Sequence, residues 1–159
     1  MRTCRRVLSV VALSTALFAA ACAAPMQPPA DFVVLKDPGE GFRAITSDDA
    51  RLRVRDLAEP TQGGLEFWAD TLAQDLVARG YERKDQGEVK NAAGGIGRWL
   101  TFAANVQGEK VGYLVAVWQV EPTLPWGAPF LRVAEFAAVD AVFQARVEAV
   151  KAALATVRG

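Results

Sequence analysis

The chain has 159 residues, no net formal charge and no histidine. This length suits one domain with its own hydrophobic core. The lack of histidine removes the commonest general base and metal ligand, and a chain without net positive charge is a poor candidate for binding nucleic acid, for which a basic face is expected. We therefore expect no catalytic residues, no metal site, no cofactor and no nucleic-acid partner.

Residues 1–21 have the features of a signal peptide. Arg2, Arg5 and Arg6 form a basic start, and Val7 to Ala21 follows without a charge. This apolar run of 15 residues is shorter than the roughly 20 that a membrane-spanning helix needs. We therefore expect an exported protein whose leader is removed before Cys22.

The residues at the cleavage site, Ala19-Ala20-Ala21-Cys22, resemble the lipobox of bacterial lipoproteins, which usually has Leu where this chain has Ala19. The resemblance implies a diacylglycerol thioether and an acylated amino terminus, such as palmitate, on Cys22. Since Ala23 is not Asp, it also implies the outer membrane, with the domain facing the periplasm. The alternative is an ordinary secretory cut at the same position, with Cys22 unmodified.

Removal of the leader leaves 138 residues with 15 basic and 18 acidic side chains. Residues 22–30 are expected to form the lipidated cysteine and a Pro-rich tether, extended over roughly 25 Å. Residues 31–159 are expected to form a single globular domain. Because Cys4 leaves with the leader, this domain contains no cysteine and can form no disulfide.

The first half of the domain shows strand and then helix patterns. Apolar residues alternate with Arg51, Arg53 and Arg55 in the third of three expected strands, which marks a half-buried strand. A helix is expected from Leu65 to Arg79, ended by Gly80 with Tyr81 folded back onto it. The strands are expected at Phe32 to Leu35, Gly41 to Thr46 and Arg51 to Leu57.

The second half predicts four strands and a closing helix. Lys110 to Glu121 has apolar residues on both faces, so we expect it in the middle of the sheet. Asp140 is expected to cap the final helix. The other strands are expected at Arg83 to Lys90, Trp99 to Val106 and Leu131 to Val139. The apolar seam of the final helix is Phe143, Val147, Val150, Leu154 and Val157.

The resulting order, β-β-β-α-β-β-β-β-α, predicts an α+β fold in which a mostly antiparallel sheet is covered by two helices, an α/β/α sandwich. The same order, with Phe67-Trp68 near the start of the first helix and Gly80-Tyr81 after it, resembles the Mog1/PsbP-like fold. That family consists mainly of non-enzymatic binding and assembly factors. The resemblance covers Phe32 to Arg158 and transfers no functional residues.

Two surfaces are candidates for interaction. Arg51, Arg53 and Arg55 form a row with a spacing of roughly 7 Å that could meet anionic lipid, glycan or an acidic partner. The alternative is a solvated strand face paired with acids such as Asp56 or Glu88, or arginine stems packed under a helix.

The second surface is the Pro-rich loop from Pro122 to Phe130, which carries Leu124, Trp126 and Phe130. Aromatic residues on loops often anchor interfaces. The alternative is that Trp126 folds back to cover one end of the sheet.

These observations predict a lipid-anchored, non-catalytic binding or assembly factor of the bacterial cell envelope, held to the membrane through Cys22 and acting on an envelope protein partner. The alternative is a periplasmic carrier of a small apolar ligand, which needs a cavity lined by Trp99, Phe102 or Trp118. An enzyme using paired carboxylates would need two acids converging in a cleft.

Overall fold

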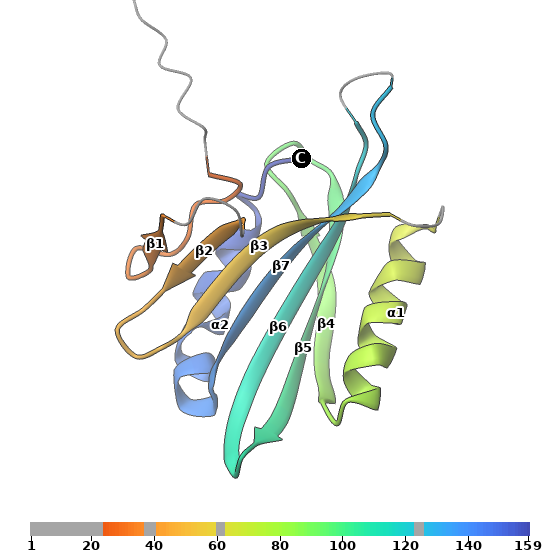
Figure 1. Ribbon diagram of the computed structural model, residues 1–159. Helices are drawn as coiled ribbons and strands as arrows, with labels where there is room; N and C mark the ends of the chain where they lie inside the picture. The colour runs from red at the N-terminus through yellow and green to blue at the C-terminus, as the bar shows by residue number, and fades with distance from the viewer. Residues whose placement is uncertain (1–23, 37–40, 60–62, 123–125) are drawn as a thin grey trace, which may run out of the picture.

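The predicted order of strands and helices is confirmed by the structure, a computed structural model that describes residues 24–36, 41–59, 63–122 and 126–159. Seven strands of these residues form one open antiparallel sheet in the order β1-β2-β3-β7-β6-β5-β4, with a helix on each face (Figure 1). The elements are β1 (Val33–Leu35), β2 (Phe42–Ile45), β3 (Arg51–Ala58), α1 (Leu65–Ala78), β4 (Glu82–Lys90), β5 (Ile96–Val106), β6 (Glu109–Val120), β7 (Phe130–Val139) and α2 (Asp140–Leu154).

One face of the sheet packs against α2. Alternation in β3 turns Leu52 and Val54 to this face, where each is 1% exposed. Four residues of the predicted helix seam, Phe143, Val147, Val150 and Leu154, are buried on α2, and Val157 is buried just after the helix has ended. As expected, β6 is an interior strand that is apolar on both faces, since Trp118 packs on the α2 side while Val117 packs on the α1 side.

The opposite face packs against α1, which contacts β4, β5 and β6. The buried residues of this helix are Ala69 and Ala73, while Leu65, Trp68, Leu72 and Leu76, which recur at helical spacing in the sequence, are only partly buried around them. Small side chains allow a helix to approach a sheet closely, so the two alanines form the centre of the contact. Sequence periodicity alone favoured the larger residues.

The end of α1 is as predicted. Gly80 adopts φ +91°, and its N–H donates to the Val77 carbonyl at 2.9 Å. The Tyr81 N–H donates to the Leu76 carbonyl at 3.0 Å, which completes a Schellman motif. Tyr81 thereby packs against the α1 core, close to Tyr113.

The start of α2 differs from the prediction. Val139 is the N-cap, and Asp140 is the first helical residue, without a side-chain capping bond. β7 runs directly into the helix, so no residue is left between them to adopt a separate capping conformation. The Asp140 carboxylate instead accepts from Gln144 at 3.2 Å and lies at the positive end of the helix dipole.

The Pro-rich segment is not a free tether along its whole length. Met26 is 1% exposed and belongs to the core on the α2 side. The Pro25 carbonyl accepts from the Arg158 N–H, and the Gln27 N–H donates to Thr156 Oγ1, both at 2.9 Å. The prediction failed because Met26 finds an apolar site beside the end of α2 that no local pattern reveals. The expected leader, its cleavage site and Cys22 lie outside the described residues.

Candidate functional site

Each helix covers only part of its face of the sheet. In Figure 1, α2 lies behind β2, β3 and β7, and the face of these strands turned towards the viewer carries no helix. We call this face the open half; its residues include Arg43, Arg53, Glu135 and Ala137, and Tyr113 of β6 lies at its border with the α1 core. The open half contains a hollow of about 560 Å³. The hollow is also lined by Leu35, Ile45, Asp49 and Arg51.

Strand alternation places the predicted arginine row on the open half. Because Leu52 and Val54 turn into the α2 core, the side chains of Arg51, Arg53 and Arg55 turn the other way. The sheet then sets Arg43 of β2 on one side of Arg53 and Glu135 of β7 on the other.

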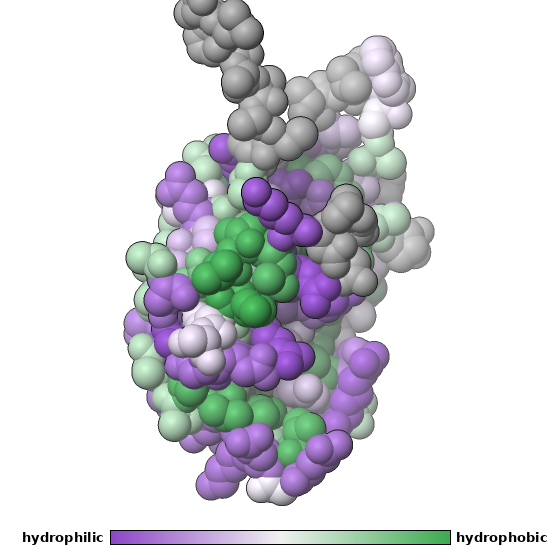
Figure 2. Space-filling model, turned by 60° about the vertical axis from the view of Figure 1, so that its left-hand side comes forward, coloured by the Kyte–Doolittle hydropathy of each residue, from purple (hydrophilic) through white to green (hydrophobic). Residues whose placement is uncertain are grey.

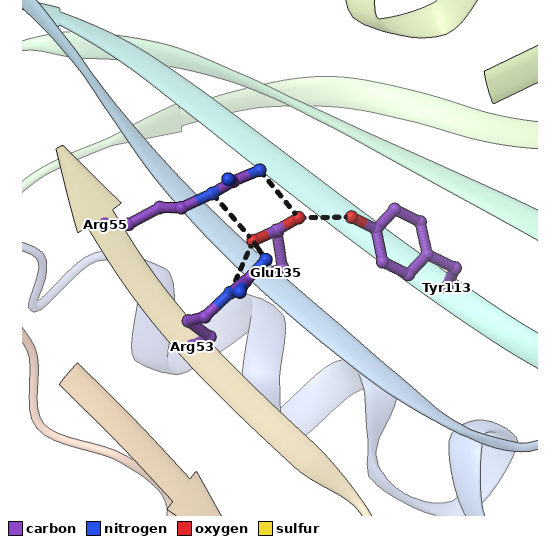
Figure 3. Close-up of polar contacts among 4 residues, drawn as sticks. All are labelled: Arg53, Arg55, Tyr113 and Glu135. Carbon is purple, nitrogen blue, oxygen red and sulfur yellow. Dashed lines mark hydrogen bonds and ion pairs between the residues drawn. The ribbon is translucent and has the colours of Figure 1, made fainter. Parts of the chain in front are cut away.

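Glu135 is the polar centre of the open half (Figure 3). Its side chain is only 13% exposed. Its Oε2 accepts from Arg53 Nε at 2.9 Å and Nη2 at 2.7 Å, and lies 3.1 Å from Arg55 Nε. Its Oε1 accepts from Arg55 Nη2 at 3.3 Å and from the Tyr113 hydroxyl at 2.7 Å. Three side chains from β3 and β6 therefore share one carboxylate on β7.

The environment of Tyr113 keeps its hydroxyl protonated. Burial is the main reason that the pKa of Tyr113 is raised above its ordinary value, and the neighbouring Glu135 carboxylate adds to the rise. A neutral phenol can donate to Glu135 throughout the physiological pH range. The group formed by Arg53, Arg55, Tyr113 and Glu135, here called the Glu135 cluster, is therefore a fixed structural unit.

Arg51 stands apart from this cluster. It pairs with Asp49 through Nε at 3.0 Å and Nη2 at 2.9 Å, and its side chain is 69% exposed. The acids suggested by the sequence pair elsewhere: Asp56 with Arg132 and Glu88 with Arg98. The arginine row is therefore not a uniformly free positive face, and its ion pairs are not formed with the acids that the sequence suggested.

The second predicted surface lies at the far end of β3 from Arg51. Trp126 is 80% exposed, so it does not fold back over the sheet. Phe130 is partly buried, with the Arg132 guanidinium 5.4 Å from its ring centroid. Leu124 lies outside the described residues. Since Ala58 pairs with Phe130 and Arg51 with Ala137, the two surfaces are separated by seven residues of strand, or roughly 23 Å.

The edge next to the open half is apolar. Val33 and Val34 of β1 are 66% and 43% exposed. Figure 2, which brings this side of the molecule forward, shows an apolar patch surrounded by hydrophilic residues. The open half thus combines a charged floor with an apolar border.

A second hollow, of about 720 Å³, lies between α2 and the strands β4 to β6. Phe102, Phe143 and Val147 line it, together with charged residues such as Lys84, Asp85 and Lys151. Trp99 lies beneath Lys151, whose ammonium is 4.0 Å from the ring centroid, and Trp118 is buried in the core. Of the three residues expected to line a carrier's cavity, this hollow therefore includes only Phe102.

Sequence reasoning missed Glu135 and Tyr113. One signal was available, because Glu135 is the single acid in the apolar run from Leu131 to Val139. Its partners could not be inferred, since Arg53 is 82 residues away and meets it only through the β3–β7 pairing.

Among the described residues, no cluster of potential metal ligands is found, and no helix has the length and hydrophobicity to cross a membrane. No protein-family model and no curated protein matches the sequence.

The solved structures that share the fold include LpqN and PA94. LpqN of Mycobacterium tuberculosis, a protein involved in cell envelope biogenesis, is similar with a TM-score of 0.66 and 11% identity, over 81% of this chain and 78% of LpqN. PA94 of Pseudomonas aeruginosa, a protein of unknown function considered to be a regulator, is similar with a TM-score of 0.57 and 10% identity, over 80% of this chain and 96% of PA94. At this level of identity, the likeness establishes a shared fold.

Proposed function

We propose that this chain is a lipid-anchored protein of the bacterial cell envelope that binds an acidic protein partner on its open half and performs no chemistry itself. The leader and the lipobox-like residues before Cys22 support the anchor. The shared fold with LpqN, an envelope-biogenesis protein, supports a cell-envelope location. The residue after Cys22 is Ala23, which favours the outer membrane.

The observation that carries the binding role is the hollow on the open half. Among the described residues on this face, the three arginines of β3, Arg51, Arg53 and Arg55, share two acids, Asp49 and Glu135, which leaves an excess of positive charge. Leu35, Ile45 and Ala137 add apolar surface beside these charges. A shallow face with arginines among apolar residues suits an acidic polypeptide better than a small ion.

The Glu135 cluster supports a non-catalytic role. A general base needs a free lone pair directed at its substrate. Glu135 already accepts hydrogen bonds from Arg53, Arg55 and Tyr113, which occupy both of its oxygens. The cluster therefore acts as the rigid floor of a binding surface.

Photo-crosslinking in the bacterium tests this proposal. A benzophenone amino acid at Ile45, on the open half, is expected to give an adduct with one envelope protein, while the same residue at exposed Val106 is not. Arg51→Glu should abolish the adduct. The matched control is Arg79→Glu, because Arg79 is 67% exposed and also pairs with one surface acid, Asp75.

Equal adducts from Ile45 and Val106, or an adduct that survives Arg51→Glu, would refute the proposed binding face. An adduct with lipid or glycan in place of protein would keep the face and refute the class of partner.

The carrier function is the second candidate, favoured by the hollow beside α2 with its apolar residues Phe143 and Val147. Native mass spectrometry of protein released gently from membranes separates the two functions. A bound small apolar molecule, lost in Val147→Glu, would support the carrier, and an unliganded mass would oppose it.

A further inference from the structure

The N-terminal segment is fixed at one end of the sheet. The Pro25 carbonyl accepts from the Arg158 N–H at 2.9 Å, and the Arg158 carbonyl accepts from Arg132 Nη1 at 2.6 Å. Arg132 also lies over the ring of Phe130, where β7 begins. The described chain therefore starts at the end of the domain that contains the loop between β6 and β7 (Figure 1). We call this the anchor end.

The docking of Pro25 limits the distance between the domain and its anchor. Cys22 precedes Pro25 by three residues. Consecutive Cα atoms are 3.8 Å apart, so the two residues can be separated by at most about 11 Å. If Cys22 carries lipid, as the proposed function states, the anchor end must stay close to the membrane surface. This inference rests on that proposed anchor.

Exposed apolar residues occupy the anchor end. Trp126 is 80% exposed, and Phe67 and Ile96 are each 54% exposed. Phe67 lies in the first turn of α1, which follows β3 in the chain, and the last residue of β3, Ala58, pairs with Phe130. Ile96 is the first residue of β5. The three side chains therefore come from three separate segments whose ends lie towards this end of the sheet.

Tryptophan is favoured at the boundary between lipid and water, where its ring meets the acyl chains and its N–H meets the headgroups. An aromatic residue that stays fully exposed to water does not obtain this stabilisation. The exposure of Trp126 and the short distance to Cys22 thus point to the same occupant, the surface of the bilayer.

We propose that the anchor end lies against the membrane that holds Cys22, with Trp126 in the headgroup region and Phe67 and Ile96 beside it. The strands then run away from the membrane. The hollow around Arg51 lies roughly 23 Å further along β3 and opens sideways into the periplasm, where a protein partner can reach it.

Because the domain contains no cysteine, a single introduced cysteine can be labelled selectively. Ala128→Cys introduces a labelling site beside Trp126, which stays in place, and Val106→Cys introduces the control near the turn at the opposite end of the β5–β6 hairpin. Both proteins are purified from membranes with their native modification, labelled with an environment-sensitive fluorophore, and reconstituted in vesicles of phosphatidylethanolamine and phosphatidylglycerol.

Lipids with a nitroxide near the headgroup are expected to quench the label at position 128 at least threefold more than the label at position 106. Adding Trp126→Ser to Ala128→Cys should reduce that quenching. Equal quenching at the two positions would overturn the inference.

Measuring the intact mass of the same preparations distinguishes a failure of the proposed orientation from a failure of the proposed lipid anchor. A lipid-modified mass with equal quenching refutes only the orientation of the domain. An unmodified mass refutes the proposed anchor, and the orientation with it.

Discussion

Tyr113 and Glu135 lie on neighbouring strands but two residues apart in register, and the tyrosine hydroxyl donates a 2.7 Å hydrogen bond to Glu135 Oε1. On the other side, the same carboxylate binds Arg53 and Arg55 of β3. One acid thus joins three adjacent strands where no helix covers the sheet. The bond is therefore a structural support for the proposed binding face.

Replacing Glu135 should destabilise the protein. Glu135→Ala leaves the Tyr113 hydroxyl without its acceptor and leaves Arg53 and Arg55 as neighbouring like charges. The two arginines are partly exposed, so water compensates for part of the loss, and we expect the free energy of unfolding to fall by about 2 kcal/mol. Urea unfolding followed by tryptophan fluorescence measures this change. Glu148→Ala, at an 80% exposed side chain, is the control and should change stability by less than about 0.5 kcal/mol. Equal effects of the two variants would contradict the role given to Glu135.

Tyr113→Phe should change how the free energy of unfolding depends on pH in alkaline solution. The folded protein raises the pKa of Tyr113, while the unfolded chain releases that proton near the ordinary value of about 10. The stabilisation from this hydroxyl is therefore complete below pH 10 and is lost as the pH rises further. We expect the variant to be about 1 kcal/mol less stable at pH 7 and the difference to shrink above pH 10. Urea unfolding measures the free energy of unfolding of both proteins. If the variant differed from wild type by the same amount at pH 7 and at pH 11, the raised pKa of Tyr113 would be contradicted.

The elements of the fold could be predicted from the sequence because their signals are local. Gly80 and Tyr81 marked the end of α1, and the alternation around Leu52 marked one strand face. The Glu135 cluster could not be predicted, because it requires β7 to lie between β3 and β6. The docking of Met26 could not be predicted for the same reason, since its neighbours Pro25 and Gln27 are bound to Arg158 and Thr156, more than a hundred residues further along the chain. Both the candidate site and the docking of the N-terminal segment depend on contacts between residues that are far apart in the sequence, which local patterns do not reveal.

Glu59 should contribute a pH-dependent stabilisation at the start of α1. Its carboxylate accepts from Trp68 Nε1 at 2.8 Å, from the Gly63 N–H at 3.1 Å and from the Gln119 amide. These bonds, with that from Trp68 the largest cause, lower the pKa of Glu59. Its stabilising effect is therefore present above the ordinary glutamate pKa and is lost as the pH falls through the lowered value.

The matching variant is Glu59→Gln, which keeps an acceptor oxygen but removes the titration. Wild type should be the more stable protein at pH 7, and its advantage should disappear as the pH is lowered below about 4. Thermal unfolding at a series of pH values measures this. An advantage that persists at pH 3 would show that Glu59 does not titrate as described.

Met26→Ala tests whether the N-terminal segment belongs to the core. The buried side chain leaves a cavity when truncated, and we expect a loss of about 2 to 4 kcal/mol in the free energy of unfolding. Val33→Ala is the control, because Val33 is 66% exposed and its truncation should cost less than about 0.5 kcal/mol. If Met26→Ala were as mild as the control, Pro25 would not be held in place, and the limit of about 11 Å between Cys22 and the domain would no longer apply.

Gly112 is required by the contact between β6 and α2. A Cβ atom added there would lie 2.1 Å from Cγ of Phe143, which is itself 4% exposed and stacked on Phe136 at 5.3 Å between ring centroids. The ring cannot move away without disturbing that stack, so Gly112→Ala should cost about 1 to 3 kcal/mol. Gly64→Ser is the matched control: Gly64 is the N-cap of α1 with φ −72°, and nothing lies within 4 Å of an added Cβ. Serine there should leave stability unchanged or raise it by a few tenths of a kcal/mol. Comparable urea midpoints for Gly112→Ala and wild type would mean that α2 lies further from the sheet than the structure places it.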